Sequence, residues 1–423
     1  MTASTLPVDP RPLRSRRRVI ANVIPPALRA PESAAAAVFA AIRHRGPVAR
    51  DVVASVSGLS IATVNRQVSA LLDARLLRER PDLSVPGAIG RPRIPVEVNH
   101  EPYLTLGVHI GARTTSIVAA DLFGRTLDAV ETATPTGDQA VGLASLADSA
   151  RRYLSRWHRR RPLWIGVAIG GVVDTATGHV DHARLGWSQA PVGPALARAL
   201  GLPVSVAPHV DAMAGAELLL GHHQPGSGSS GLYFYARETV GFAQVIDGRV
   251  HTPSGGPGTI AGLPVQSELL GGTGQLESTV SDEAIVAAAR KSGILPADGP
   301  NSSITSLRRI ARQDDGSAAA DARELFAERA RVLGGAVALL RDMLNPDDVL
   351  VGGQAFTEYP EGMKQFRAAF SERSLLPPRQ IKVTGFGNRV QEFGAGVVSL
   401  SGLYADPLGA LRRSDNRRSL VSA

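Results

Sequence analysis

Apolar positions recur with a helical period near the beginning of the chain. Three consecutive segments, each with apolar side chains three and four positions apart, read SAAAAVFAAIRHRG, ARDVVASVSG and SIATVNRQVSALLDARLL. Gly46 and Gly58 end the first two segments, and Ser60 is suited to cap the third. Two strand-like stretches around a Gly- and Pro-rich loop follow in LLRERPDLSVPGAIGRPRIPVEVN. This order predicts a winged helix-turn-helix over residues 33–100.

The pattern changes to alternating strands and helices after residue 100. Strand patterns in YLTLGVHIGARTTSIVAADLFGRTLDAVET and PLWIGVAIGG are separated by an amphipathic helix pattern, and a similar block follows farther along the chain. These two blocks predict a two-lobed α/β domain over residues 101–410 with a cleft between the lobes. The flanking residues 1–32 predict a disordered basic arm, and residues 411–423 a basic C-terminal tail.

Composition narrows the class of protein. The chain of 423 residues has no cysteine, which excludes disulfides and thiolate metal sites, and it has no long apolar run or apolar signal segment. We therefore expect a cytoplasmic protein without a membrane partner. The net charge of +8 lies entirely in residues 1–100. An Arg-rich solvated arm is one explanation, but the charged segment also has the pattern of a folded domain, which favours nucleic-acid binding.

The third helical segment has the features of a recognition helix. One face is expected to be buried and carries Ile61, Val64, Val68 and Leu71. The other face carries Ala62, Thr63, Asn65, Arg66 and Ser69. Asn can read adenine and Arg can read guanine in the major groove, whereas an ordinary exposed helix face is the plainer alternative. The expected DNA contacts are Arg50, Ser60, Ala62, Thr63, Asn65 and Arg66.

The loop between the two strand patterns contains the sequence GRPR. Its Arg91 and Arg93 project two guanidinium groups from a chain that Pro92 stiffens. Such a segment suits the narrow minor groove of A·T-rich DNA. Because the segment lies within the predicted wing, we expect both arginines to contact DNA.

These segments, together with those that follow, resemble the ROK family of sugar kinases and repressors. The resemblance covers roughly residues 35–405 and rests on GLSIATVNRQVSALL, GRPR, LGVHIGARTTSIVAADLFGRTLD, GVAIGGVVDTATGHV, LGLPVSVAPHVDAMAGAELLLG, GTIAGLPV, GGTGQLE and LNPDDVLVGG, in the order of the family. It implies a winged helix-turn-helix followed by a two-lobed actin/hexokinase-like (ribonuclease H-like) ROK domain. It also implies a homodimer or higher homo-oligomer.

The family's catalytic motifs are altered in this chain. The phosphate motif Asp-x-Gly-Gly-Thr of the kinases corresponds to HIGAR, which places His109 at the metal-side acid and Arg113 at the threonine. The catalytic Asn-Asp pair corresponds to Pro208 and His209. A neutral imidazole can accept a proton, but phosphoryl transfer depends mainly on positioning and charge neutralisation. The resemblance therefore implies no catalytic residue here.

The family's sugar and zinc motifs are also replaced. Glu-Ile-Gly-His corresponds to TIAG, so Thr259 and Gly262 replace two polar groups. The cysteines of the zinc motif correspond to Glu268, Leu270 and Gln275. We expect no bound metal and no cofactor.

Some polar groups remain near the implied cleft. The candidate ligand-binding residues are Gly171, Gln189, His209, Asp211, Thr259 and Glu277. Glu277 matches a sugar-contacting glutamate of the family, with a surface or helix-capping acid as the alternative. Asp211 is open to a capping role, and Trp187 is expected in the core rather than as a sugar platform.

The sequence thus predicts a transcriptional regulator that binds a double-stranded DNA operator. Its ROK domain would serve dimerisation, and either sense a small-molecule effector or act as a scaffold alone. A divergent ROK-type sugar kinase is the alternative function.

Overall fold

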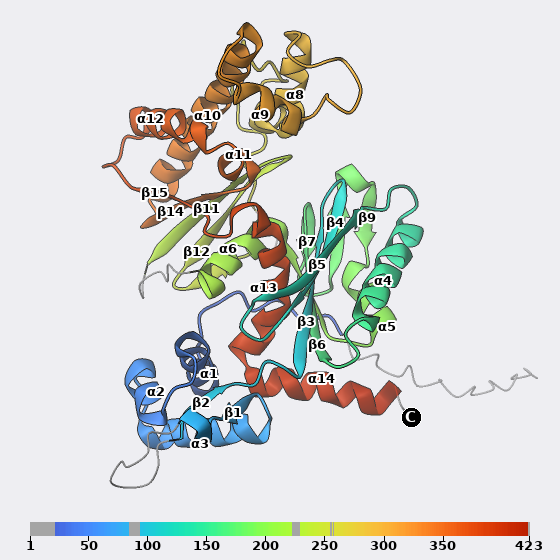
Figure 1. Cartoon of the computed structure of the whole chain (residues 1–423), viewed down its shortest axis with the longest axis vertical. Coiled ribbons are helices and arrows are strands. Elements are labelled where there is room, and N and C mark those ends of the chain that lie inside the picture. Colours follow the sequence, from blue (N-terminus) through green and yellow to red (C-terminus); the bar gives the residue numbers. More distant parts are fainter. Residues whose placement is uncertain (1–21, 84–93, 222–228, 254–255, 257, 422–423) are drawn as a thin grey trace, which may run out of the picture.

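The N-terminal domain consists of three helices and a two-stranded wing (Figure 1). The computed structural model describes residues 22–83, 94–221, 229–253, 256 and 258–421. The antiparallel strands β1 and β2 close the domain, as the sequence predicts. Its elements are α1 (Ala34–Arg45), α2 (Arg50–Ser57), α3 (Ile61–Asp73), β1 (Leu77–Glu79), η1 (Pro81–Leu83) and β2 (Val96–Val98).

The first lobe of the larger domain contains a five-stranded sheet in the order β10-β6-β3-β4-β5. Strands β3 and β6 are buried on both faces, which explains their continuous apolar runs. A small sheet β7-β8-β9 is attached to this lobe. The elements are β3 (Tyr103–Ile110), β4 (Thr114–Ala120), β5 (Thr126–Ala133), α4 (Gln139–Ser155), β6 (Arg161–Ile169), β7 (Val172–Asp174), β8 (His179–His182), η2 (Ala183–Leu185), β9 (Trp187–Ala190), α5 (Val192–Leu200), β10 (Val204–Pro208) and α6 (His209–Leu220).

The second lobe contains a five-stranded sheet in the order β13-β12-β11-β14-β15. Each sheet combines an antiparallel meander with two parallel strands, so the two lobes repeat one plan. The elements are β11 (Ser230–Ala236), β12 (Val240–Ile246), β13 (Arg249–His251), α7 (Leu276–Val280), α8 (Asp282–Lys291), α9 (Ile304–Ala311), α10 (Ser317–Leu344), β14 (Asp348–Gly352), α11 (Gln354–Thr357), η3 (Pro360–Gly362), α12 (Met363–Arg373), β15 (Ile381–Val383), η4 (Gly387–Arg389), α13 (Val390–Ala405) and α14 (Pro407–Val421).

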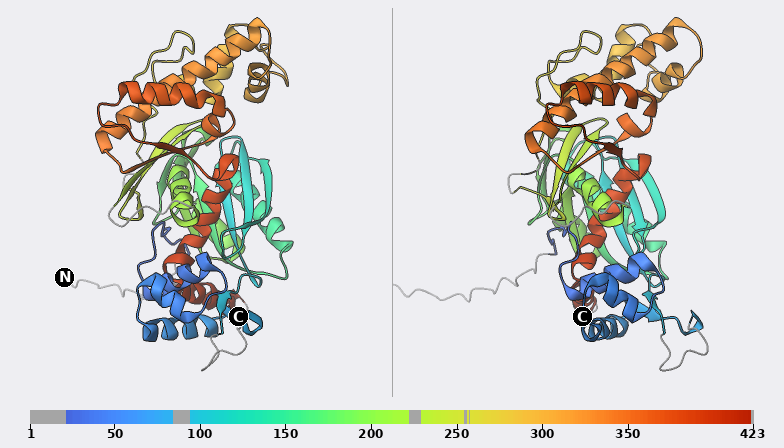
Figure 2. Two further views of the ribbon diagram at one scale, coloured as in Figure 1. Left: turned by 60° about the vertical axis from the view of Figure 1, so that its left-hand side comes forward. Right: turned by 90° about the vertical axis from the view of Figure 1, so that its left-hand side faces the viewer.

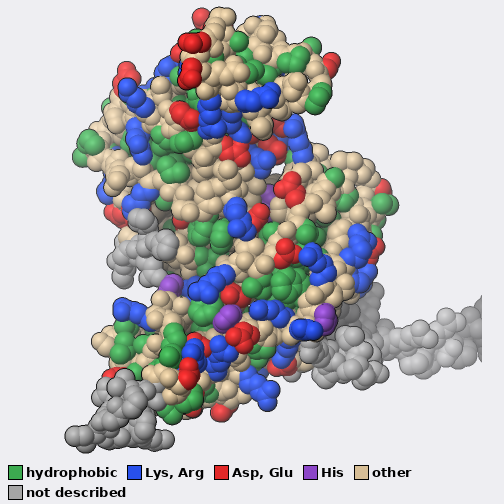
Figure 3. Space-filling view, in the orientation of Figure 1, with side chains coloured by type: hydrophobic (Ala, Val, Ile, Leu, Met, Phe, Trp, Pro, Cys, Tyr) green, Lys and Arg blue, Asp and Glu red, His purple; other side chains and the backbone are tan. Residues whose placement is uncertain are grey.

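Helices α6 and α13 pack against each other between the two sheets (Figure 1). Gly394 of α13 lies against the backbone of Ala212 in α6, where an added Cβ would come within 3.2 Å of the backbone carbon. A side chain here would press on the backbone of α6, so the close approach of the two helices favours glycine at this position. The mixed α/β, two-lobed architecture predicted from the sequence is therefore confirmed. Figure 3 shows the notch between the lobes on the molecular surface.

The described parts of both predicted tails pack on the folded domains, whereas residues 1–21 of the predicted arm lie outside the described residues. Within the predicted arm of residues 1–32, Val23 forms a bridge with Val204 and the side chain of Leu28 is 5% exposed, because apolar residues here cover the larger domain. The predicted tail of residues 411–423 is helical as far as Val421 in α14. Helix α14 contacts α1 and α3, so this helix packs against the winged helix (Figure 2).

Candidate DNA interface and effector cleft

The start of α3 has the geometry of a capped helix after a tight turn. Gly58 adopts a left-handed conformation with φ of 67°, which favours glycine. The Ser60 hydroxyl oxygen accepts a hydrogen bond from the backbone N–H of Thr63 at 3.2 Å. The same hydroxyl donates to Thr63 Oγ1 at 3.0 Å. The predicted N-cap at Ser60 is confirmed, and its hydroxyl already has partners within the helix.

The outer face of α3 is open to solvent. Val64, Val68 and Leu71 are fully buried, as predicted. Ile61 was expected in the same buried stripe, but it is 49% exposed because the first residue of the helix lacks a preceding turn to cover it. An exposed apolar side chain at this position is suited to contact a thymine methyl group. The remaining outer residues are exposed Ala62, Asn65, Arg66 and Ser69, and half-buried Thr63.

Of the other predicted DNA contacts, only Arg50 belongs to the described part of the chain. Arg50 begins α2 and forms an ion pair with Glu79 of β1 at 3.3 Å. This pair connects the helix-turn-helix with the wing. Arg91 and Arg93 lie outside the described residues.

A cavity of about 340 Å³ lies between the lobes at the beginning of α6. Strand β10 ends at Pro208, so the first residue of α6, His209, lies at the cavity. Four of the predicted ligand-binding residues come together here: Gly171, His209, Thr259 and Glu277. The sequence therefore identified chain segments from both lobes that meet in space.

Gln189 and Asp211 do not line this cavity, contrary to expectation. The amide group of Gln189 donates to Asp181 at 2.7 Å on the outside of the small sheet. Asp211 is 1% exposed, and one of its carboxylate oxygens accepts from the hydroxyl of Thr252 at 2.7 Å. It makes no capping hydrogen bond, because the first turn of α6 directs it into the protein. Burial raises the pKa of Asp211 to about 6.

Three histidines surround the cavity. The rings of His109 and His209 stack with their centroids 6.1 Å apart. Burial lowers the pKa of His109 to about 3, with a smaller effect of the neighbouring His209. Burial likewise lowers the pKa of His209 to about 4. Both imidazoles are therefore neutral near pH 7. His182 is the third, and its Nδ1 accepts from the backbone N–H of Leu185 at 3.3 Å, which places the ring proton on Nε2.

Neutral histidines lie at the positions that the resemblance assigns to charged groups of a phosphoryl-transfer site. His109 Nε2 is buried without a hydrogen-bond partner among the described residues. A neutral imidazole at this position provides no negative charge for a metal ion. His209 also packs edge-to-face on Tyr235 at 5.3 Å between ring centroids, which holds its ring in place.

Arg113 makes a contact between the lobes. Its guanidinium group is 3.1 Å from Glu283 of α8 in the opposite lobe. Arg184 reaches the same carboxylate at 3.6 Å. The residue that replaces the motif's threonine thus joins an ion-pair group between the lobes.

Thr259 and Glu277 differ in how tightly they are held. Thr259 is exposed, and its hydroxyl oxygen accepts from the backbone N–H of Ala261 at 3.2 Å. Glu277 accepts from the backbone N–H of Val240 at 3.1 Å, which connects α7 with β12. The Glu277 side chain is half-buried, and this hydrogen bond to another element is not a helix cap. One carboxylate oxygen of Glu277 thus has a structural partner.

The positions of the zinc motif do not form a ligand cluster. Leu270 is 4% exposed and packs in an apolar cluster, whereas Gly262, Glu268 and Gln275 are exposed. Within the described ranges, no group of three or more His, Asp or Glu side chains could hold a metal ion. Nor does any described helix combine the length and the apolar character that a bilayer span requires.

Sequence reasoning missed several polar residues of the cavity, among them Tyr235 and Gln391. Tyr235 is 2% exposed, and its hydroxyl accepts from the amide group of Gln391 at 2.7 Å. Tyr235 has the pattern of an ordinary core residue in its strand, and Gln391 is separated from it by more than 150 positions. The only signal in the sequence is that the strand pattern of β11 continues as far as Tyr235. Trp187 is 3% exposed and belongs to the core of the first lobe, as expected.

Comparison with known proteins gives a consistent result. Residues 105–389 match the ROK family. A protein of Mycobacterium tuberculosis named as a transcriptional regulator is 69% identical over 410 residues, which cover 95% of this chain and 92% of the relative. A glucokinase of Halalkalibacterium halodurans is 26% identical over 312 residues, 69% of this chain and 93% of that enzyme.

The fold is similar to that of a solved regulator. The crystal structure of a ROK family transcriptional regulator, a homologue of the Escherichia coli Mlc protein, has a TM-score of 0.70 and 23% sequence identity. The similarity covers 92% of this chain and 98% of that one. The two-lobed domain and the N-terminal helices therefore occur together in a known fold.

Proposed function

This chain belongs to the ROK family, and we propose that it is a transcriptional regulator that binds duplex DNA through residues 33–100. The observation that carries the proposal is the exposed face of α3, on which Asn65 and Arg66 project after a capped turn. Both side chains are suited to base edges in the major groove. The positive charge of residues 1–100 supplies attraction to the phosphate backbone.

The two-lobed domain is proposed to be catalytically inactive. Phosphoryl transfer needs a metal-bound, charge-neutralising site and a base that orients the sugar hydroxyl. Here His109 and His209 occupy the two carboxylate positions, and Arg113 is paired with Glu283. These replacements support a regulator rather than a divergent sugar kinase.

We further propose that the chain forms a homodimer and that the cavity between the lobes is a candidate effector site. Dimerisation through the ROK domain would present two winged helices to two half-sites. The cavity has polar groups from both lobes, so a ligand there would bind better to one lobe arrangement than to others.

The proposal is tested by mapping the genomic sites that the full chain occupies. Chromatin immunoprecipitation with the native protein is expected to enrich discrete sites that contain an inverted repeat. The double variant Asn65→Ala with Arg66→Ala, produced at equal level, is expected to lose this enrichment. Equal enrichment by the double variant would show that α3 does not select the sites.

A further inference from the structure

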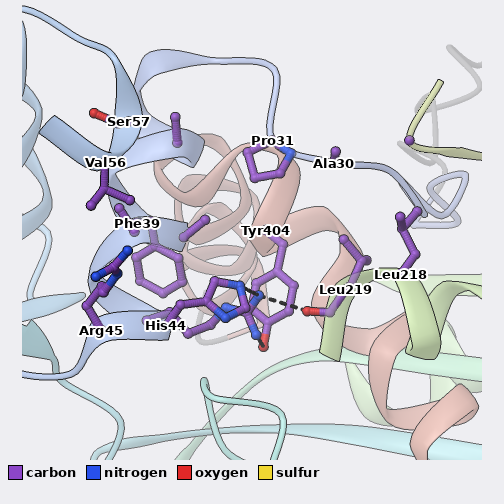
Figure 4. Close-up of a pocket in the computed structure, with 15 residues that line it drawn as sticks. Ala30, Pro31, Phe39, His44, Arg45, Val56, Ser57, Leu218, Leu219 and Tyr404 are labelled. Carbon is purple, nitrogen blue, oxygen red and sulfur yellow. Dashed lines mark hydrogen bonds between the residues drawn. The ribbon is translucent and has the colours of Figure 1, made fainter. Parts of the chain in front are cut away.

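A second cavity, of about 410 Å³, lies where the winged helix meets the larger domain (Figure 4). It is bounded by α1 and α2 on one side, and by the end of α6 and Tyr404 of α13 on the other. Small-molecule pockets have volumes of roughly 300–1,000 Å³, so this cavity has room for a small ligand. It is separate from the cavity at His209, which lies at the opposite end of α6.

The walls of this interdomain cavity are largely apolar. Pro31, Phe39 and Leu218 contribute to them, together with alanines of α1 and Val56 of α2. Val56 is 43% exposed. None of the described residues that line the cavity is acidic, whereas Arg43 and Arg45 are basic. The lining is therefore complementary to a molecule with an apolar body and a negative charge.

Arg43 is a half-buried cation whose recorded partners are neutral. Its guanidinium group donates to the carbonyl oxygen of Leu219 at 2.9 Å, shown by the dashed line in Figure 4. It also lies 4.2 Å above the ring of Tyr404. His44 Nε2 is 2.9 Å from the same guanidinium nitrogen. Since arginine has only donors, that imidazole nitrogen accepts. Burial, with a smaller effect of Arg43, lowers the pKa of His44 to about 4.

The guanidinium group of Arg43 thus has no counter-ion in the described part of the chain. Among the described residues, no carboxylate lies within ion-pair distance of it. Its Nε atom is buried and has no hydrogen-bond partner in the described part of the chain. Buried charges in proteins are normally paired, so an anion supplied by a ligand would satisfy this group.

We propose that the interdomain cavity binds a small amphipathic carboxylate, with the carboxylate group at Arg43 and the apolar body along α1 and Leu218. The site itself does not depend on the proposed function, but its regulatory effect rests on that function. A bound carboxylate would compete with the Leu219 carbonyl and the Tyr404 ring for Arg43. Because these two residues belong to the larger domain, binding would change how the winged helix is held and thereby its affinity for DNA.

The test uses octanoate as the probe with the full chain, by isothermal titration calorimetry. Octan-1-ol has the same chain without the charge, and acetate has the charge without the chain. Octanoate is expected to bind at least about tenfold more tightly than either, because only octanoate uses both parts of the site. Equal binding of octanoate and octanol, or no binding of octanoate, would overturn the proposal.

Two variants locate the site and one controls for charge. Arg43→Gln is expected to remove the preference for octanoate over octanol, and Ala40→Phe is expected to abolish binding by filling the cavity. Arg367→Gln removes an exposed arginine of α12 and is expected to leave binding unchanged. Octanoate binding that survives both Arg43→Gln and Ala40→Phe would place the ligand elsewhere and overturn the proposal. Circular dichroism confirms that each variant is folded.

DNA affinity is measured separately by fluorescence anisotropy. Octanoate is expected to change the affinity of the native protein for its operator and to leave that of Arg43→Gln unchanged. Octanoate binding without any DNA binding would contradict the proposed function and leave the site intact. DNA binding without octanoate binding would contradict the site and leave the function intact.

Discussion

The imidazole rings of His109 and His209 stack at the cavity between the lobes, with an interplanar angle of 21°. Each comes from a different element, β3 and α6. By the resemblance to the family, each corresponds to an acid of the kinases. Protonation of both rings would place two positive charges together in a buried position. The fold therefore disfavours protonation of either ring.

Stability is expected to fall as the pH drops below about 6.5. The folded-state pKa of His109 is lowered to about 3, so the unfolded chain takes up a proton at a pH where the folded chain does not. The free energy of unfolding is therefore highest above the unfolded pKa of about 6.5, and it decreases as the pH falls from there toward the folded pKa. The difference for His109 between pH 7 and pH 5 is about 2 kcal/mol.

Urea unfolding at both pH values measures this effect. The variant His109→Gln is expected to lose about 2 kcal/mol less than the native protein between pH 7 and pH 5. His158→Gln replaces an exposed histidine and is the matched control. An identical pH slope for the native protein and His109→Gln would show that His109 is not held neutral by the fold.

The recognition helix is tested one residue at a time. Asn65→Ala or Arg66→Ala is expected to weaken specific DNA binding by about 1–3 kcal/mol and to relax the base preference at one position of the half-site. Ile61→Ala is expected to reduce discrimination for thymine at an adjacent position. Anisotropy titrations with an operator and a scrambled duplex separate specific from general affinity, with Arg152→Ala in the larger domain as the control. Equal losses on both duplexes would indicate phosphate contacts only.

The wing makes a different prediction. Replacing Arg91 and Arg93 by Ala is expected to flatten the preference for A·T-rich flanks, because these arginines read groove width rather than base edges. Removal of two phosphate-neutralising charges is also expected to lower the slope of log K against log salt concentration by about 2. An unchanged slope would mean that the wing is not in the groove.

Assembly is tested by sedimentation. The chain is expected to be a dimer at micromolar concentration, and the operator an inverted repeat with half-sites separated by whole helical turns. Insertion of half a helical turn between the half-sites is expected to weaken binding strongly, whereas a full turn restores it in part. A monomer that binds one half-site as tightly as the full operator contradicts this prediction.

Simple hexoses are expected to bind weakly or not at all. Thr259 and Gly262 present few polar groups to a sugar, and unsatisfied hydroxyls cost affinity on burial. Calorimetry with glucose, N-acetylglucosamine and their 6-phosphates compares the native chain with His209→Asp plus Thr259→Glu and Gly262→His. A gain of binding by the triple variant would support a cleft that has kept its shape. Micromolar hexose binding by the native chain would refute this prediction. ATP hydrolysis in the presence of glucose would separately refute the proposed lack of catalytic activity.

The helical period and the turn residues determined most of the N-terminal fold in advance. Gly58, Ser60 and the buried Val64 and Val68 lie as the pattern indicates, because caps and stripes are local properties. Ile61 departs from the pattern because the burial of a residue at a helix end depends on which other parts of the fold pack against it. Local sequence does not specify that relationship.

The candidate cleft could be predicted only in part. Family resemblance placed four residues from both lobes at one cavity, namely Gly171, His209, Thr259 and Glu277. Gln189 and Asp211 were misplaced because their partners, Asp181 and Thr252, are fixed by tertiary packing rather than by motif spacing. The partners of Arg43, at positions 219 and 404, are likewise invisible in the linear sequence.

The contact between the winged helix and α14 has a consequence for the order of folding. In the sequence, the whole two-lobed domain separates helices α1 and α3 from their partner α14. Contacts between residues so far apart along the chain form slowly, because a long loop has to close before they stabilise the fold. The winged helix is therefore expected to gain its own helices early and its orientation on the larger domain late.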